Sequence, residues 1–105
     1  MSSTAGDGTR PWRFLTNHAQ VLLCIAHDPE IRVREISEAT GITERAAHRI
    51  VAELDTAGYI TRTRNGRRNN YTIQSHLPLP DPPARGEKVG DLLSVLTRDM
   101  DGRLE

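Results

Sequence analysis

Four arginines fall within seven residues near the middle of the chain, on both sides of Asn65-Gly66. They are Arg62, Arg64, Arg67 and Arg68. No acidic residue occurs between Asp55 and Asp81, so nothing in this stretch of sequence balances their charge. A guanidinium group is a planar fork of donors that suits phosphate oxygens and base edges. Grouped positive charge repels itself unless an anion compensates it, so the cluster favours contact with a polyanion such as DNA.

A second set of polar side chains precedes the arginines, on a predicted helix that begins after Thr43 and ends near Ala57. The exposed positions near its start are Thr43, Glu44, Arg45, His48 and Arg49. Either arginine could fork onto guanine O6 and N7, Glu44 could accept from cytosine N4, and Thr43 and His48 could touch bases or phosphates. An ordinary solvated helix face would carry the same residues, so this set alone does not decide between the two interpretations.

A helix–turn–helix is predicted to position these side chains. The first helix of the pair covers Val33–Thr40, with Val33, Ile36 and Ala39 facing inward and Gly41 at its end. The second is capped by Thr43. Its apolar positions line one face and are Ala47, Ile50, Val51 and Leu54. The second helix is therefore braced by the first and can present its opposite face to DNA.

A hairpin is predicted directly after the helix pair, because Asn65-Gly66 is a strong signal for a two-residue turn. In that register Arg64 faces Arg67, and Ile60 faces Tyr71. Ile60 and Tyr71 would anchor the hairpin to the core while its charged tip projects into solvent.

The flanking segments are predicted to support this unit. An earlier helix begins at Asn17 as its N-cap, with Gln20 completing a capping box, and stops at Asp28-Pro29. The predicted domains are a disordered tail at 1–11, a DNA-binding domain at 12–74, a proline-rich linker at 75–86, and a packing helix at 87–100. Apolar residues in both flanks suggest a dimer contact. They are Trp12, Phe14, Leu15, Val89, Leu92, Leu93 and Leu96.

Composition limits the remaining function classes. The 105 residues suit one small domain with tails, the net charge is zero, and no signal peptide or membrane-spanning run is predicted, so we expect a cytoplasmic protein. No nucleophile–base pair, glycine-rich phosphate loop or HExxH motif occurs, so we expect no enzyme activity and no cofactor.

A metal site is the weakest of the candidate sites. Cys24 and His27 are three positions apart on the earlier helix, and His18 lies nearby. A lone cysteine without a second thiolate is a poor soft-metal sensor, and the spacing matches no closed zinc site. Cys24 lies in an apolar run and is better explained as a small core residue, so we predict no metal site.

The span from Ile36 to Ile73, ISEATGITERAAHRIVAELDTAGYITRTRNGRRNNYTI, resembles the winged helix-turn-helix domain of bacterial regulators of the MarR and ArsR type. The resemblance extends over about residues 17–74 and implies an α+β fold, mainly helical: a three-helix core, a β-hairpin wing and a C-terminal helix. It implies that the helix carrying Thr43 to Arg49 is the recognition helix. It also implies a homodimer joined by terminal helices, with repression the commoner outcome. MarR-type regulators build a pocket for phenolic ligands from longer terminal helices, and the short flanks here give a small-molecule effector no support.

The sequence therefore predicts a homodimeric, sequence-specific regulator of transcription that binds double-stranded DNA. In this interpretation the recognition helix chooses the sequence, while the wing residues Arg62, Arg64, Asn65, Arg67 and Arg68 supply salt-dependent affinity. The alternative is a winged-helix module that binds other proteins, which the zero net charge would suit. Weak binding to DNA of any sequence would favour that alternative.

Overall fold

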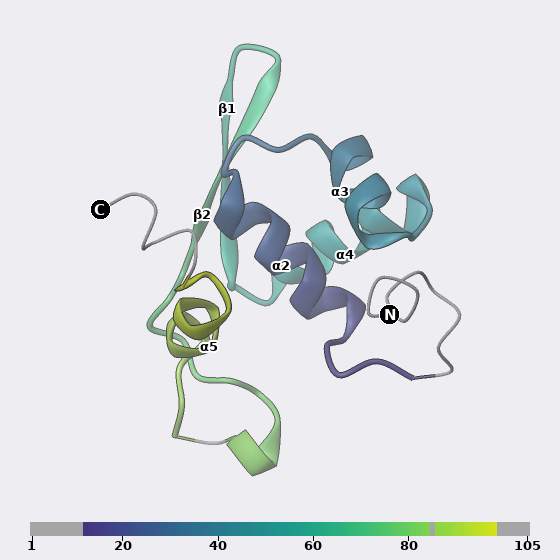
Figure 1. Cartoon of the computed structure of the whole chain (residues 1–105). Coiled ribbons are helices and arrows are strands. Elements are labelled where there is room, and N and C mark those ends of the chain that lie inside the picture. Colours follow the sequence, from purple (N-terminus) through teal and green to yellow (C-terminus); the bar gives the residue numbers. More distant parts are fainter. Residues whose placement is uncertain (1–11, 85, 99–105) are drawn as a thin grey trace.

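A helical body with a projecting hairpin makes up the part of the chain described by a computed structural model, residues 12–84 and 86–98 (Figure 1). The elements in order are α2 (Asn17–His27), α3 (Val33–Thr40), α4 (Glu44–Thr56), β1 (Ile60–Asn65), β2 (Arg68–Ile73), a 3-10 turn η1 (Pro82–Ala84) and α5 (Val89–Leu96). The predicted tail at 1–11 and the predicted helix end at Met100 lie outside the described residues. No described helix is long and apolar enough to cross a membrane.

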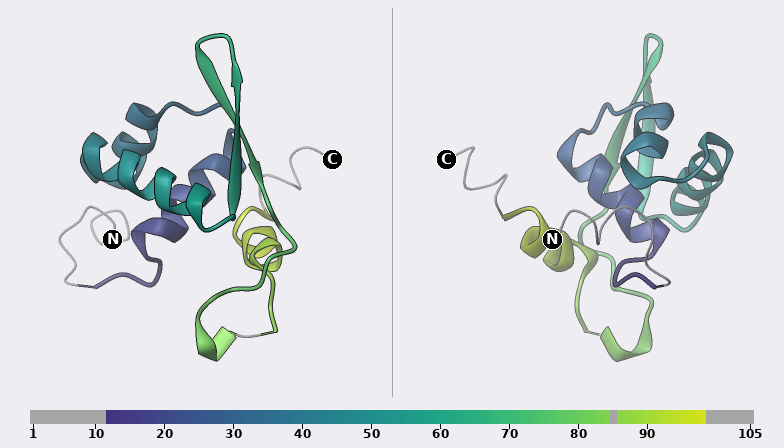
Figure 2. Two further views of the ribbon diagram at one scale, coloured as in Figure 1. Left: turned by 180° about the vertical axis from the view of Figure 1, so that it is seen from behind. Right: turned by 45° about the vertical axis from the view of Figure 1, so that its right-hand side comes forward.

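One apolar core joins all the helices to the hairpin. Helix α2 packs against α3 and α4 on one side and against α5 on the other, as both views in Figure 2 show. Ile25, Ile36 and Ile50, one from each of the first three helices, are almost completely buried. Burying a side chain of this size stabilises a fold by about 1.5–3 kcal/mol. The core residues are Val21, Leu22, Ile25, Ile36, Ala47, Ile50, Val51, Leu54, Ile60, Tyr71, Val89 and Leu93.

Helix α2 ends where predicted, but its cap lies one residue earlier. Thr16 is the N-cap, and its hydroxyl accepts a hydrogen bond from the backbone N–H of Ala19 at 3.1 Å. Asn17 is the first helical residue, so the prediction of an Asn17 cap was wrong. Gln20 does not complete a capping box on Asn17; its side-chain amide donates to the carbonyl of Leu15 at 3.1 Å. Threonine and asparagine both cap helices, and the sequence alone does not separate two adjacent candidates.

The helix–turn–helix has the predicted boundaries and a different inward face on its first helix. Gly41 ends α3 with φ 77°, and Thr43 caps α4. Ala39 is exposed, whereas Ser37 and Thr40 are buried with Ile36. The hydroxyl of Thr40 donates to the carbonyl of Ile36 at 2.8 Å, so this polar side chain is satisfied within its own helix. Because its hydroxyl is already hydrogen-bonded, Thr40 can be buried. The buried face of α3 is therefore formed by Ile36, Ser37 and Thr40 and does not include Ala39.

The hairpin turns one residue later than predicted, so each residue of β1 pairs with a residue two positions further along β2 than predicted. Ile60 pairs with Ile73, Arg64 with Asn69, and Asn65 with Arg68, so the two turn residues are Gly66 and Arg67. Of these two only Gly66 has positive φ, at 67°. This fits a type II′ turn, which needs positive φ at its first central residue alone, whereas Asn65-Gly66 as a type I′ turn needs it at both. The predictions that Arg64 faces Arg67 and that Ile60 faces Tyr71 were therefore wrong, although Ile60 and Tyr71 are both buried.

The proline-rich segment after the hairpin folds back and holds α5 in place. The backbone N–H of Val89 donates to Leu77 O at 2.9 Å, and that of Gly90 donates to Ser75 O at 3.0 Å. A Cβ at position 90 would lie 2.7 Å from the Cβ of Ser75, so only glycine permits this approach. The predicted proline-rich linker contains the short turn η1, and Pro78 forms an isolated bridge with Lys88. Helix α5 begins at Val89, two residues later than predicted.

Candidate nucleic-acid interface

The start of α4 presents the predicted recognition residues to solvent. The hydroxyl of Thr43 accepts from Ala46 N at 3.0 Å, so this side chain caps the helix. The opposite face of α4 is buried against α2 and α3. Glu44, Arg45, His48 and Arg49 are all exposed, as predicted. The fold therefore leaves one turn and a half of α4 open to a partner.

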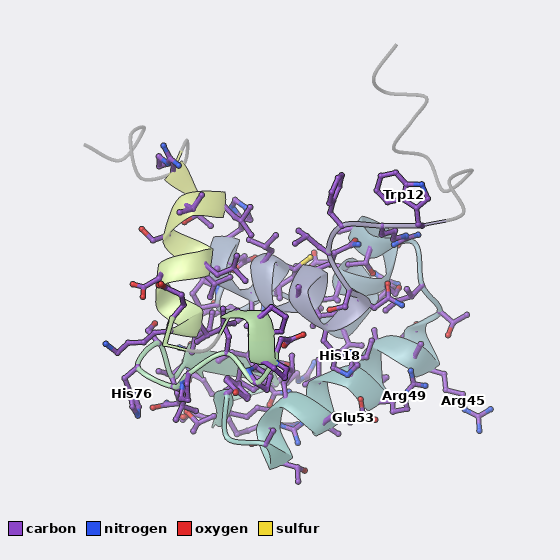
Figure 3. All side chains as sticks on the ribbon, turned by 90° about the horizontal axis from the view of Figure 1, so that it is seen from below. Trp12, His18, Arg45, Arg49, Glu53 and His76 are labelled. Atoms are coloured by element: carbon purple, nitrogen blue, oxygen red, sulfur yellow. The ribbon has the colours of Figure 1, made fainter. Side chains whose placement is uncertain are left out.

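One exposed side of α4 carries two arginines followed by a glutamate. Arg45, Arg49 and Glu53 follow one another at four-residue intervals, and Figure 3 shows both arginines projecting outward from α4. Arg49 Nε lies 3.7 Å from Glu53 Oε2, and its side chain is 62% exposed. An exposed pair of this kind is weak, so Arg49 can exchange it for another anion. Among the residues that the structure describes, no carboxylate pairs with Arg45.

A contact that the sequence did not reveal joins α4 to α2. His18 Nε2 lies 2.6 Å from Glu53 Oε1, and the two side chains are both about half exposed (Figure 3). The two residues are 35 positions apart, and no local pattern indicates that they meet. Glu53 therefore contacts a histidine of α2 with one carboxylate oxygen and lies near Arg49 with the other.

The wing arginines are less uniform than their clustering suggested. Arg62 donates from both Nε and Nη2 to Asp55 Oδ2, at 3.2 and 3.0 Å, so it ties the base of the wing to α4. Arg64 Nε donates to the turn carbonyl of Gly66 at 3.1 Å. Arg68 also forms an ion pair, since its Nη1 lies 3.8 Å from Glu30 Oε1.

The carboxylates of Asp55 and Glu30, which lie outside the hairpin, therefore balance part of the positive charge of the wing arginines. Arg67, at the turn, has no ion pair with any described residue. Asn65, also predicted to contact DNA, is exposed at the end of β1 beside Arg68. Arg67 is accordingly the wing side chain most available to an external anion.

A channel of about 550 Å³ lies between α4 and the wing. Glu44 and His48 line it from α4, and Arg67, Arg68 and Asn69 line it from the wing. The remaining wall is the connection from α2 to α3, residues 30–34. The start of α4 and the basic hairpin thus face one shared channel.

A family model described as the MarR family matches residues 14–68, more than half of the chain. The chain belongs to the MarR family. The family match confirms the predicted resemblance, and MarR-family proteins are winged helix-turn-helix transcriptional regulators.

The fold is also similar to a solved domain, fragment 1–100 of Mb0332 from Mycobacterium bovis, with a TM-score of 0.52. The two are 24% identical, and the match covers 87% of this chain and 73% of that one. That domain is described as the homodimeric winged helix-turn-helix DNA-binding domain of a possible ArsR-family transcriptional regulator. At this identity the likeness shows the fold, which is the predicted winged helix. No curated protein matches the chain significantly.

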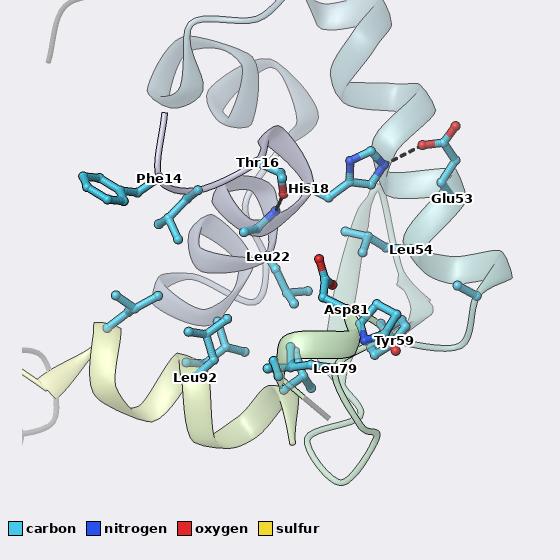
Figure 4. A pocket seen from close by; sticks show the side chains of 18 residues that line it. Phe14, Thr16, His18, Leu22, Glu53, Leu54, Tyr59, Leu79, Asp81 and Leu92 are labelled. Carbon is cyan, nitrogen blue, oxygen red and sulfur yellow. Dashed lines mark hydrogen bonds and ion pairs between the residues drawn. The ribbon is translucent and has the colours of Figure 1, made fainter. Parts of the chain in front are cut away.

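A second concave surface of this MarR-family chain lies beside α5, away from the wing. It is an apolar groove of about 560 Å³ between α2, α5 and the proline-rich segment (Figure 4). Phe14, Leu15, Leu92 and Leu96 line it, and Phe14 is 88% exposed. Trp12 stacks edge-on against Phe14 with ring centroids 4.9 Å apart.

Two of the predicted dimer residues serve the protomer itself. Val89 and Leu93 are buried in its own core, since α5 packs against α2. Both also line the apolar groove, so their predicted role in the dimer contact stays a prediction. The other five predicted residues remain at least partly exposed around the apolar groove, and they are Trp12, Phe14, Leu15, Leu92 and Leu96.

Cys24 is half-buried on α2, and burial raises the pKa of its thiol. No group of three or more potential metal ligands occurs among the described residues.

Because the thiolate is the reactive form, we expect Cys24 to react with a disulfide reagent at pH 8 more slowly than free cysteine does. Unfolding in guanidinium should remove the difference, which absorbance of the released thiol would measure. Reaction at the rate of free cysteine in the folded protein would contradict this prediction.

Proposed function

We propose that this MarR-family regulator binds double-stranded DNA sequence-specifically as a homodimer and represses transcription. In this proposal α4 enters the major groove, where Arg45, His48 and Arg49 read bases. The wing lies over the adjacent minor groove, where Arg67 and Arg68 contact the backbone. Repression is proposed because it is the commoner outcome in the family. Such a protein acts in the cytoplasm, where bacterial DNA lies.

The observation that carries the proposal is the shared channel between α4 and the wing. Exposed polar residues at the start of α4 face this channel from one side, and Arg67 lies at its other side without an ion pair among the described residues. Arg62 is assigned a supporting role, because its two donors already engage Asp55.

The homodimer is supported by the apolar groove beside α5. Phe14 and Leu96 leave apolar surface open to solvent around this concave site, which is unusual for a small monomer. The structurally similar Mycobacterium bovis domain is homodimeric. A two-fold pair would place two copies of α4 about one helical turn of DNA apart, on a palindromic site.

The experiment that tests the proposal is an anisotropy titration of labelled duplex, selected from random DNA, across a range of salt concentrations. Arg67→Ala should reduce the salt slope by about one unit per bound protomer and weaken binding roughly tenfold per lost contact near ~0.1 M salt. Arg98→Ala removes the same charge from an exposed position beyond α5 and should change neither quantity.

Two outcomes would contradict the proposal. If Arg67→Ala left both affinity and salt slope unchanged, the wing assignment would be lost. If selection enriched no sequence and binding stayed weak on every duplex, the protein-binding alternative would replace DNA recognition.

A further inference from the structure

We infer that the channel between α4 and the wing holds one sugar-phosphate strand, and that Arg32 and Arg34 contact its phosphates. This inference rests on the proposed function, and it assigns to DNA binding two residues outside the recognition helix and the wing. Both are exposed and line the channel from its third wall.

The path of the strand follows from the shape of duplex DNA. Major and minor grooves are separated by a single sugar-phosphate strand on each side. A helix in one groove and a hairpin over the next must therefore have that strand between them. In this protein the space between α4 and the wing is the channel of about 550 Å³. Side chains on the walls of the channel other than α4 consequently face phosphate oxygens instead of base edges.

The third wall is fixed relative to the wing. The backbone N–H of Tyr71, in β2, donates to the carbonyl of Pro29 at 2.8 Å. Ile31 N donates to Asp28 O at 3.0 Å, so the loop before α3 is itself closed by a turn. Val33 begins α3, and Arg32 N donates to Glu35 Oε1 at 3.0 Å. These bonds fix the backbone that carries Arg32 and Arg34 beside the wing.

The charges lining the channel suit a polyanion. Arg32, Arg34, Arg67 and Arg68 outnumber the two carboxylates that also line it, those of Glu30 and Glu44. Among the described residues, neither Arg32 nor Arg34 pairs with a carboxylate. Glu30 Oε1 lies 3.8 Å from Arg68 Nη1, so a phosphate in the channel would compete with Glu30 for that guanidinium.

Three variants test this inference in the full chain by anisotropy titration on the selected duplex. Arg32→Ala with Arg34→Ala should reduce the salt slope by up to about two units per protomer and weaken binding to selected and scrambled duplexes by equal factors. Arg34→Lys in the otherwise native chain should keep the salt slope, because it keeps the charge. Glu30→Gln should strengthen binding several-fold, because it removes a competing anion near Arg68. Glu87→Gln is the matched control at an exposed position outside the channel.

Neutral methylphosphonate linkages, placed one at a time in the duplex, locate the contact. The native protein should lose affinity at one or two linkages on the strand between the grooves. The Arg32→Ala, Arg34→Ala variant should lose no more at those linkages, because the contact is already absent. Circular dichroism of each variant verifies the fold.

The outcomes separate this inference from the function on which it rests. If Arg67→Ala flattens the salt slope while Arg32→Ala with Arg34→Ala does not, the inference is overturned and the proposed function stands. If the double variant is still sensitive to the same linkages, the contact comes from other residues and the inference is again overturned. If the native protein does not bind the duplex, both proposals fall.

Discussion

Phe14→Glu should convert the proposed dimer into a monomer, as sedimentation at micromolar concentration would show. Phe14 is 88% exposed in the protomer, so replacing it should leave the protomer's own stability almost unchanged. In the proposed dimer, however, this ring is buried, and an unpaired carboxylate there is costly. Affinity for a duplex with two half-sites should then fall by about 10²–10⁴-fold, because the second half-site contact is no longer intramolecular.

The controls for Phe14→Glu distinguish loss of pairing from loss of folding. Thr72→Glu adds the same charge at an exposed position on β2 outside the apolar groove and should sediment as the native protein does. Affinity for a duplex with a single half-site should be equal in Phe14→Glu and in the native chain. A native protein that sediments as a monomer, or a Phe14→Glu variant that remains dimeric, would refute this assignment of the groove.

Arg45→Ala is expected to remove sequence discrimination at one base pair of each half-site. Arg45 is exposed and has no carboxylate partner among the described residues, whereas Arg49 lies 3.7 Å from Glu53. A bidentate arginine–guanine contact contributes about 1–3 kcal/mol of discrimination, and a dimer makes it twice. Competition between selected and base-substituted duplexes measures the effect directly.

Arg45→Lys separates the effect of charge from the effect of base recognition, because lysine keeps the positive charge but lacks the planar pair of donors that binds guanine. Its affinity for scrambled DNA should match the native value, while its preference for the selected sequence should be reduced. If Arg45→Ala instead weakens binding to every duplex by the same factor, Arg45 contacts phosphate and base reading belongs to other residues of α4.

Local signals in the sequence were sufficient to predict the helix–turn–helix. Gly41 and Thr43 stop one helix and start the next, and the apolar spacing of Ile50, Val51 and Leu54 identifies the buried face of α4. Errors arose where two local solutions are nearly equal. Thr16 and Asn17 both cap helices, and the hairpin can turn at Asn65-Gly66 or one residue later.

Contacts between distant residues could not be predicted from the sequence. The gap in acidic residues from Asp55 to Asp81 suggested that the wing arginines had no partners, yet Glu30 from the loop before α3 lies near Arg68. Nothing in the local sequence around Arg32 and Arg34 indicates that they line one channel with the wing. Long-range pairing depends on how helices and strands pack, and residue spacing within one element does not encode it.

The close approach of Gly90 to Ser75 has a mechanical consequence. Strand β2 ends at Ile73, two residues before Ser75, and Gly90 is the second residue of α5. Backbone contact at this point leaves no compliant side chain to absorb relative motion between the strand and the helix. We therefore expect a change in the tilt of the wing to change the tilt of α5. Displacing the tip of the hairpin should then also move the helix that borders the apolar groove.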